Sequence, residues 1–154
     1  MSKIMRVASR KLAVKLIKKW EGFMPEPYLC PAGVPTIGFG TTRYENGDEV
    51  SMDDCVIDRK RGEEILLHHI KGVEDQIIKV LKHKLEPNKM AALTSFTYNL
   101  GIGNLKRSTL LILINNGPRN QNIPREFKRW NKAGGKVLAG LTARREEEST
   151  LWSA

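Results

Sequence analysis

The chain has 154 residues, of which 40% are hydrophobic and 28% charged, a composition typical of a globular protein with a sizeable core. Its formal net charge of +9 favours anionic partners such as nucleic acid, an anionic membrane or an acidic cell-wall polymer. The longest apolar run, LLILI at 110–114, is far too short for a membrane span, and charges interrupt the N-terminal segment. We therefore expect neither a transmembrane anchor nor a signal peptide.

The cysteines and histidines predict no metal centre and no disulfide framework. Two cysteines are too few for such a framework, and the three histidines lack the spacing of zinc ligands. We predict that the protein uses no metal and no cofactor.

The first predicted element is a helix over residues 9–22. Leu12, Leu16 and Trp20 form an apolar stripe with basic side chains opposite, and Gly22 can end the helix. The basic face is either simply solvated or attracts a polyanion, and the pattern allows both.

Residues 25–50 predict a small antiparallel β-lobe. Prolines and glycines break any helix there, and VPTIGFGTT is typical of a short strand. Asn46-Gly47 is a strong signal for a two-residue hairpin turn.

Helices are predicted for the rest of the chain. Ser51 is a candidate N-cap for a bridging helix over 52–81, long enough to connect two lobes. Pro87 and Gly101 have the positions expected for the start and the end of the next helix. Shorter helices are expected over 106–115, 124–132 and 142–152, within a helical lobe over 86–153. The prediction is one α+β domain over 1–154, mostly α, with a β-hairpin lobe and a helical C-terminal lobe.

Glu21 is the first candidate for chemistry. It follows a basic helix and is flanked in sequence by Trp20, Phe23 and Met24. An apolar setting raises the pKa of a carboxyl group, as a general acid near neutral pH requires, and the negative end of the helix dipole acts in the same direction. The position alone is more typical of an ordinary surface glutamate after a helix.

The spacing around Glu21 resembles a family signature. Glu21-x8-Cys30-x5-Thr36, followed by IGFGTT, resembles the E-x8-(D or C)-x5-T pattern of the phage-type lysozymes, the endolysin muramidases. Three further blocks, LIKKWEG, FTYNLGIGNLKRSTLL and FKRWNKAGGKVLAGLTARREEE, resemble that family in the same order. The resemblance covers nearly the whole chain and implies a lysozyme-like fold.

The resemblance also implies roles for individual residues. It makes Glu21 the general acid of a glycoside hydrolase and gives Cys30 and Thr36 the second and third catalytic positions. The implied reaction is hydrolysis of the β-1,4 bond between N-acetylmuramic acid and N-acetylglucosamine in peptidoglycan. Cys30 could act as a thiolate base, as a covalent nucleophile or as a group that positions water, and we favour water activation with Thr36. This choice leaves a retaining or an inverting outcome open.

A second set of residues lies in family-like blocks and could line the substrate cleft. These residues are Asn99, Arg144 and Arg145. A capping asparagine and a solvated helix end are the alternative interpretations.

The expected setting is bacterial lysis by a phage or prophage protein. We expect a monomer made in the host cytoplasm that reaches the wall after a separate holin-type protein permeabilises the membrane. Its expected partners are peptidoglycan strands and the anionic envelope, rather than nucleic acid, because aromatic residues are sparse at 6%.

Two other functions remain open. A lytic transglycosylase needs only one acid, which suits a chain without the second carboxylate. A non-catalytic cationic protein that binds the envelope would use only the basic helices. Pairing of Cys30 with Cys55 in an oxidising compartment is a separate possibility.

Overall fold

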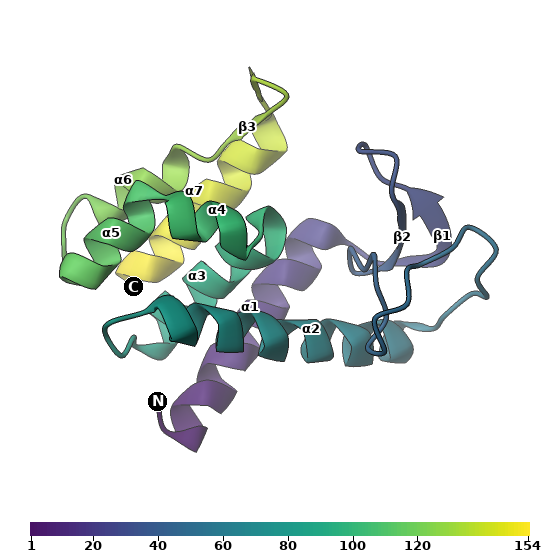
Figure 1. The fold of residues 1–154 in the computed structure, drawn as a ribbon, viewed down its shortest axis with the longest axis horizontal. Helices are drawn as coiled ribbons and strands as arrows, with labels where there is room; N and C mark the ends of the chain where they lie inside the picture. Colours follow the sequence, from purple (N-terminus) through teal and green to yellow (C-terminus); the bar gives the residue numbers. More distant parts are fainter. The chain divides into compact units, whose positions relative to one another are not determined.

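The computed structural model describes all residues, 1–154, and divides into two compact units (Figure 1). The smaller unit is Val14–Gly72, and the larger one combines Met1–Ala13 with Val73–Ala154. The predicted α+β class, mostly α with a small antiparallel hairpin, is confirmed. That the whole chain acts as one catalytic domain stays a prediction.

The structure contains seven helices and four short strands. In chain order they are α1 (Lys3–Glu21), β1 (Met24–Leu29), β2 (Pro35–Gly38), α2 (Arg59–Val80), α3 (Pro87–Leu100), α4 (Ile102–Arg107), α5 (Thr109–Asn116), α6 (Ile123–Lys128), β3 (Lys132–Ala133), β4 (Lys136–Val137) and α7 (Ala139–Ser153).

Helix α1 starts six residues earlier than predicted. Ser2 caps its first turn, because its Oγ accepts the backbone N–H of Met5 at 3.2 Å. The predicted stripe is confirmed in part, since Ile17 beside it is buried and Trp20 is half-buried. Ala13 and Leu16 are buried, whereas Leu12 is 36% exposed.

Strands β1 and β2 form the predicted β-lobe hairpin, with Tyr28 opposite Thr36. Pro25 and Pro27 are tolerated in β1 because a two-stranded sheet has free edges, and the register is interrupted between Met24 and Tyr28. A tight turn forms near Asn46-Gly47, but Gly47 N–H donates to Tyr44 O at 3.0 Å, so the central residues are Glu45 and Asn46 instead of the predicted pair. Only an isolated bridge between Arg43 and Glu49 flanks this turn.

Helix α2 begins at Arg59, not at residue 52 as predicted from Ser51. The backbone N–H of Ser51 donates to Asp54 Oδ2 at 2.8 Å, so these residues form a turn instead of a helix cap. Ile57 N–H then donates to Pro25 O at 3.0 Å, which ties the following segment to β1. The cap of α2 is Asp58, whose Oδ1 accepts the N–H of Arg61 at 2.8 Å.

The larger unit is built around helix α3, which begins at Pro87 and is closed by Gly101, both as predicted. Helix α7 packs against α3 and α6 (Figure 1). The segment predicted as one helix over 106–115 divides at Ser108, whose Oγ caps α5 by accepting the N–H of Leu111. The short β3–β4 hairpin was not predicted.

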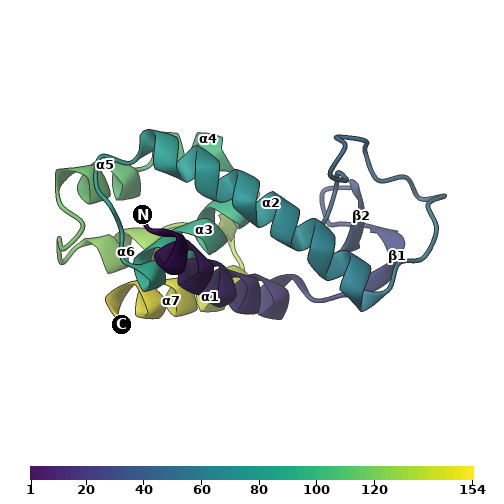
Figure 2. The same ribbon diagram turned by 90° about the horizontal axis from the view of Figure 1, so that it is seen from below.

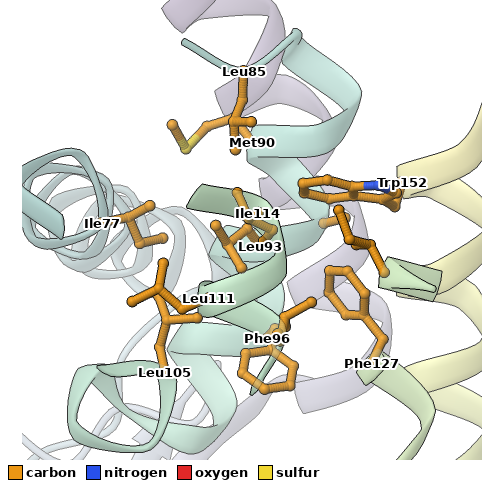
Figure 3. Close-up of a cluster of buried hydrophobic side chains, with 13 residues drawn as sticks. Ile77, Leu85, Met90, Leu93, Phe96, Leu105, Leu111, Ile114, Phe127 and Trp152 are labelled. Atoms are coloured by element: carbon orange, nitrogen blue, oxygen red, sulfur yellow. The ribbon is translucent and has the colours of Figure 1, made fainter. Parts of the chain in front are cut away.

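Aromatic rings form one end of the core of this unit (Figure 3). The rings of Phe96 and Phe127 meet edge to face at 5.5 Å, and Phe127 lies 5.6 Å from Trp152. Leu93 and Ile114 fill the middle of the same cluster. Such packing fixes the positions of α3, α5, α6 and α7 within the unit.

Candidate active site

The β1–β2 hairpin brings Cys30 and Thr36 together in the smaller unit. Cys30 is the first residue after β1, where its N–H donates to Val34 O at 3.0 Å and its carbonyl accepts from Gly33 N–H at 2.8 Å. Thr36 lies on β2, is 3% exposed, and donates from Oγ1 to Val34 O at 2.9 Å. The tight turn therefore sets the relative positions of the two predicted catalytic side chains.

The turn also favours the thiolate form of Cys30. Hydrogen bonds from the backbone N–H groups of Val34 and Ala32 lower the pKa of the Cys30 thiol, and the Thr36 hydroxyl adds a smaller effect in the same direction. The single proton of that hydroxyl can serve either the sulfur or Val34 O at any one time. The site thus has the donors needed to hold a partially negative sulfur.

Glu21 is the last residue of α1, and its carboxyl group lies against Gly40. A Cβ atom at residue 40 would be 2.5 Å from Glu21 Oε2 and 3.0 Å from its Cδ. Gly40 also has φ +72°, a left-handed conformation that favours glycine. Gly40, two residues after the end of β2, therefore lies directly against the carboxyl group of the predicted general acid.

Tyr28 is a residue of the same site that sequence reasoning missed. Burial raises the pKa of its phenol, and the charges of Glu21 and Cys30 raise it further. These effects place Tyr28 within electrostatic reach of both predicted catalytic groups. The only available signal was its position between Glu21 and Cys30 within the signature.

Aromatic and basic side chains pack together near the end of α1. The rings of Phe23 and Phe39 lie 5.2 Å apart, and the guanidinium of Arg59 is within 5.5 Å of each ring centre. Lys18 on α1 pairs with Glu63 on α2. These contacts fix the end of α1, where Glu21 lies, against the start of α2.

Arg144 and Arg145, the predicted substrate-binding arginines, lie on α7 in the larger unit. Arg145 is fully buried and binds Glu148 with two nitrogens, at 2.7 Å from Nε and 3.1 Å from Nη2. Burial raises the pKa of Glu148, and the paired guanidinium opposes that shift. Arg144 is 4% exposed and lies 3.3 Å from Ser95 O.

Asn99 lies near the end of α3 in the same unit, where its Oδ1 is buried and has no hydrogen-bond partner. A buried amide oxygen of this kind has an unused acceptor. Contact of the substrate with Asn99, Arg144 or Arg145 stays a prediction. The contacts described for Arg144 and Arg145 are all with residues of the larger unit, to which both arginines belong.

The structure contains no group of three or more His, Cys, Asp or Glu side chains arranged as metal ligands. None of its helices is both long enough and apolar enough to cross a membrane.

Comparison with known proteins decides the family. Residues 18–148 match the phage lysozyme family, a range that includes Glu21, Cys30 and Thr36. The chain belongs to the phage lysozyme family. The predicted resemblance is thereby confirmed for the family, while the roles of individual residues stay predictions.

Relatives agree with this assignment. The endolysin of Bacillus phage B103 is 39% identical over 90% of this chain. An endolysin of Acyrthosiphon pisum secondary endosymbiont phage 1 is 34% identical, with 90% of this chain and 93% of the relative covered. The solved endolysin from Escherichia coli O157:H7 phage FAHEc1 superposes with a TM-score of 0.83 at 32% identity, over 92% of this chain and 90% of the other.

The relatives differ in length. The chain spans about half of the endolysins of Bacillus phages B103 and PZA, at 51% and 53% of their lengths. The match to these longer proteins therefore concerns one part of each.

Proposed function

We propose that this phage lysozyme is an endolysin muramidase that hydrolyses the β-1,4 bond between N-acetylmuramic acid and N-acetylglucosamine and so lyses the host cell. The observation that carries the proposal is the local arrangement in the smaller unit. A carboxyl group seated on Gly40 shares its electrostatic surroundings with a thiol held in a turn of N–H donors.

The proposed first step is proton transfer by Glu21. Its carboxyl proton passes to the glycosidic oxygen as the bond from that oxygen to the muramic C1 breaks, and positive charge develops at C1. General acid catalysis of this kind typically contributes about 10²–10⁴-fold to the rate.

The second step is attack by water, which Cys30 activates. The thiolate takes one proton from the water as the water oxygen bonds to C1. The resulting Cys30 thiol then releases that proton to solvent, and the carboxylate of Glu21 takes one up from solvent, which restores both groups. The lowered pKa of Cys30 supports this role, because an ordinary thiol with a pKa near 8.5 is only a few per cent ionised at pH 7. Thr36 positions the sulfur through its hydroxyl.

Mass spectrometry of the muropeptides released from isolated peptidoglycan tests the proposal. We expect Glu21→Gln to lower the rate of release at least about 100-fold, because an amide has no acidic proton to give. Undiminished release would overturn the proposal. Products ending in 1,6-anhydromuramic acid would identify a lytic transglycosylase instead.

A Cys30→Ser variant tests the base. A serine hydroxyl has no accessible ionised form near neutral pH, so we expect a loss of about 100-fold or more if the thiolate accepts the proton. A near-normal rate would show that the group at this position only orients water.

The biological setting is part of the same proposal. The chain acts as a monomer on peptidoglycan strands in the anionic envelope, after a holin-type protein has permeabilised the membrane. Its net charge of +9 supports attraction to the anionic envelope. Lysis of permeabilised cells that persisted in Glu21→Gln would instead identify a non-catalytic, envelope-disrupting cationic protein.

A further inference from the structure

The larger unit contains a pocket that has no part in the proposed reaction. It has a volume of about 240 Å³ and is lined by residues from the start of α1, the end of α2 and the segment that joins α2 to α3. Figure 2 shows the course of these segments. Its deep residues are apolar, since Leu85 and Met90 are 1% and 2% exposed. The buried part of the pocket's lining is therefore apolar.

Cations line the same pocket. Arg6, Lys82 and Lys84 belong to its wall, and the two lysines are exposed, which places them toward its mouth. Arg6 acts electrostatically on Glu74, but that carboxylate is buried and already paired with Arg10 at 2.9 Å. The mouth is thus strongly positive.

The surrounding sequence extends this positive charge. Residues 1–13 and 78–90 together contain eight Lys or Arg and a single acid, Glu86. No Phe, Tyr or Trp lines the pocket, and the one ring that does, His83, is hydrogen-bonded through Nε2 to Asn115 O at 2.9 Å, so the pocket lacks a large stacking surface for nucleic-acid bases. The charge favours an anionic ligand, and the apolar interior favours one that also has a hydrocarbon part.

Exposed apolar side chains lie on the adjoining helix. Ile4 is 82% exposed and Val7 is 45% exposed, and both lie close to Arg6 in the sequence at the start of α1. Large apolar groups among cations are typical of a surface that lies in a membrane interface. The exposed apolar side chains favour a lipid in a bilayer over a small free anion as the ligand.

We propose that this pocket binds an anionic phospholipid and seats the larger unit on an anionic membrane surface. Arg6, Lys82 and Lys84 hold the phosphate headgroup, the start of an acyl chain lies against Leu85 and Met90, and Ile4 enters the interface. The site is independent of the muramidase chemistry, which the proposed function assigns to the smaller unit.

Co-sedimentation of the full chain with vesicles tests the proposal. We expect binding to phosphatidylglycerol–phosphatidylcholine vesicles and none to pure phosphatidylcholine. The double variant Lys82→Glu/Lys84→Glu should bind at least about tenfold more weakly, because each cation near an anionic surface contributes measurably to affinity. Lys106→Glu/Lys132→Glu is the matched control, with the same change of charge at exposed positions of the same unit outside the pocket.

A second pair of variants tests the apolar contribution. Ile4→Ser should weaken vesicle binding several-fold, whereas Ile112→Ser, at another exposed isoleucine, should not. All variants should release muropeptides from isolated peptidoglycan at the wild-type rate, which shows that they fold and that failure of the lipid site is distinct from failure of the proposed function.

Three results would overturn the lipid site. The first is an absence of binding to the anionic vesicles. The second is an equal loss in the pocket variant and its charge-matched control, which would indicate general attraction by the net charge. The third is complete displacement from vesicles by glycerol 3-phosphate at the concentration of the lipid, which would indicate a site for small anions only.

Discussion

At the scale of single residues, Gly40 determines where the carboxyl group of Glu21 lies. The space that a Cβ would occupy at residue 40 is already taken by the Glu21 side chain. The position of the general acid therefore depends on the absence of a side chain 19 positions later in the sequence. Gly47 offers a comparison, since it also has a positive φ, +91°, but nothing lies within 4 Å of its Cβ position.

Gly40→Ala should lower the rate of peptidoglycan hydrolysis by about 100-fold. The new methyl group displaces the Glu21 carboxyl group, and a displacement near 1 Å costs about that much when a catalytic group must be aligned. Gly47→Ala introduces the same backbone strain, so both variants should lose about 1–2 kcal/mol of stability. Turbidity assays and thermal unfolding of both proteins check this, and equal activities would show that the seat on Gly40 has no catalytic importance.

Cys30 should react as a more acidic thiol than ordinary cysteine. Because backbone N–H groups lower its pKa, the thiolate forms at lower pH, and alkylation by iodoacetamide should reach half its maximal rate below about pH 8.5. The measurement uses a Cys55→Ser background so that a single thiol reports. Thr36→Val should move the midpoint upward. A midpoint at or above that of free cysteine would contradict the role of the turn.

At the scale of elements, α2 contains two glycines in contrasting surroundings. A Cβ on Gly62 would lie 2.8 Å from the ring of Phe23 and 3.5 Å from that of Phe39. A Cβ on Gly72 would meet nothing within 4 Å. Gly62 lets α2 pack closely against the rings of Phe23 and Phe39, whereas Gly72 makes no such contact.

Alanine substitutions should therefore have opposite effects at these two positions. Gly72→Ala should stabilise the protein by about 0.5–1 kcal/mol, because alanine favours a helix interior. Gly62→Ala has the same helical gain but crowds Phe23, for which we expect a net loss of about 1 kcal/mol. Urea unfolding of the two variants gives the comparison, and stabilisation by both would show that Phe23 moves aside freely.

Element boundaries show where sequence patterns were sufficient. Pro87 and Gly101 act through their own backbone preferences, so the limits of α3 were predictable. Ser51 was misleading because Asp54 and the distant Pro25 O hold the following segment in another conformation. A capping residue does not start a helix when a tertiary hydrogen bond requires the next residues to be extended.

At the scale of the whole molecule, the larger unit contains a buried ion pair, for which we expect a large effect on stability. Arg145 and Glu148 are both fully buried, and the Arg145 guanidinium also lies 5.2 Å from the ring centre of Phe96. Arg61 and Glu64 have the same i,i+3 spacing at 3.6 Å, but their side chains are 41% and 55% exposed. The two pairs share their spacing but differ in burial and in geometry, because Arg61 binds Glu45 with two nitrogens, at 2.6 and 2.8 Å, and only approaches Glu64.

Glu148→Ala should cost about 3–5 kcal/mol in the free energy of unfolding, because it leaves a buried guanidinium uncompensated. Glu64→Ala should cost less than about 1 kcal/mol, as is usual for exposed pairs. Unfolding by guanidinium chloride at pH 8, where both glutamates are ionised in the unfolded chain, provides the comparison. Equal costs for the two variants would mean that burial of the Arg145 pair has no energetic consequence.

The candidate site was predictable to a different extent in its different parts. Glu21, Cys30 and Thr36 followed from a fixed spacing, and that spacing lies within the range that matches the family. Tyr28 and Gly40 were missed, because an electrostatic neighbour and an excluded Cβ have no pattern of their own. Arg145 was identified as a cleft residue from its block, but only the packing of α7 revealed its buried pairing with Glu148.

By itself, the sequence determined the family, the α+β class, the β1–β2 hairpin and the net positive charge, since these depend on local backbone preferences, on spacing and on composition. The tertiary structure decided which carboxyl group lies on Gly40, why α2 begins at Arg59, and which cations surround an apolar pocket. Each of these depends on contacts between residues far apart in the chain. Such contacts form only when the whole chain is packed, because their energies depend on distance and burial rather than on neighbouring sequence.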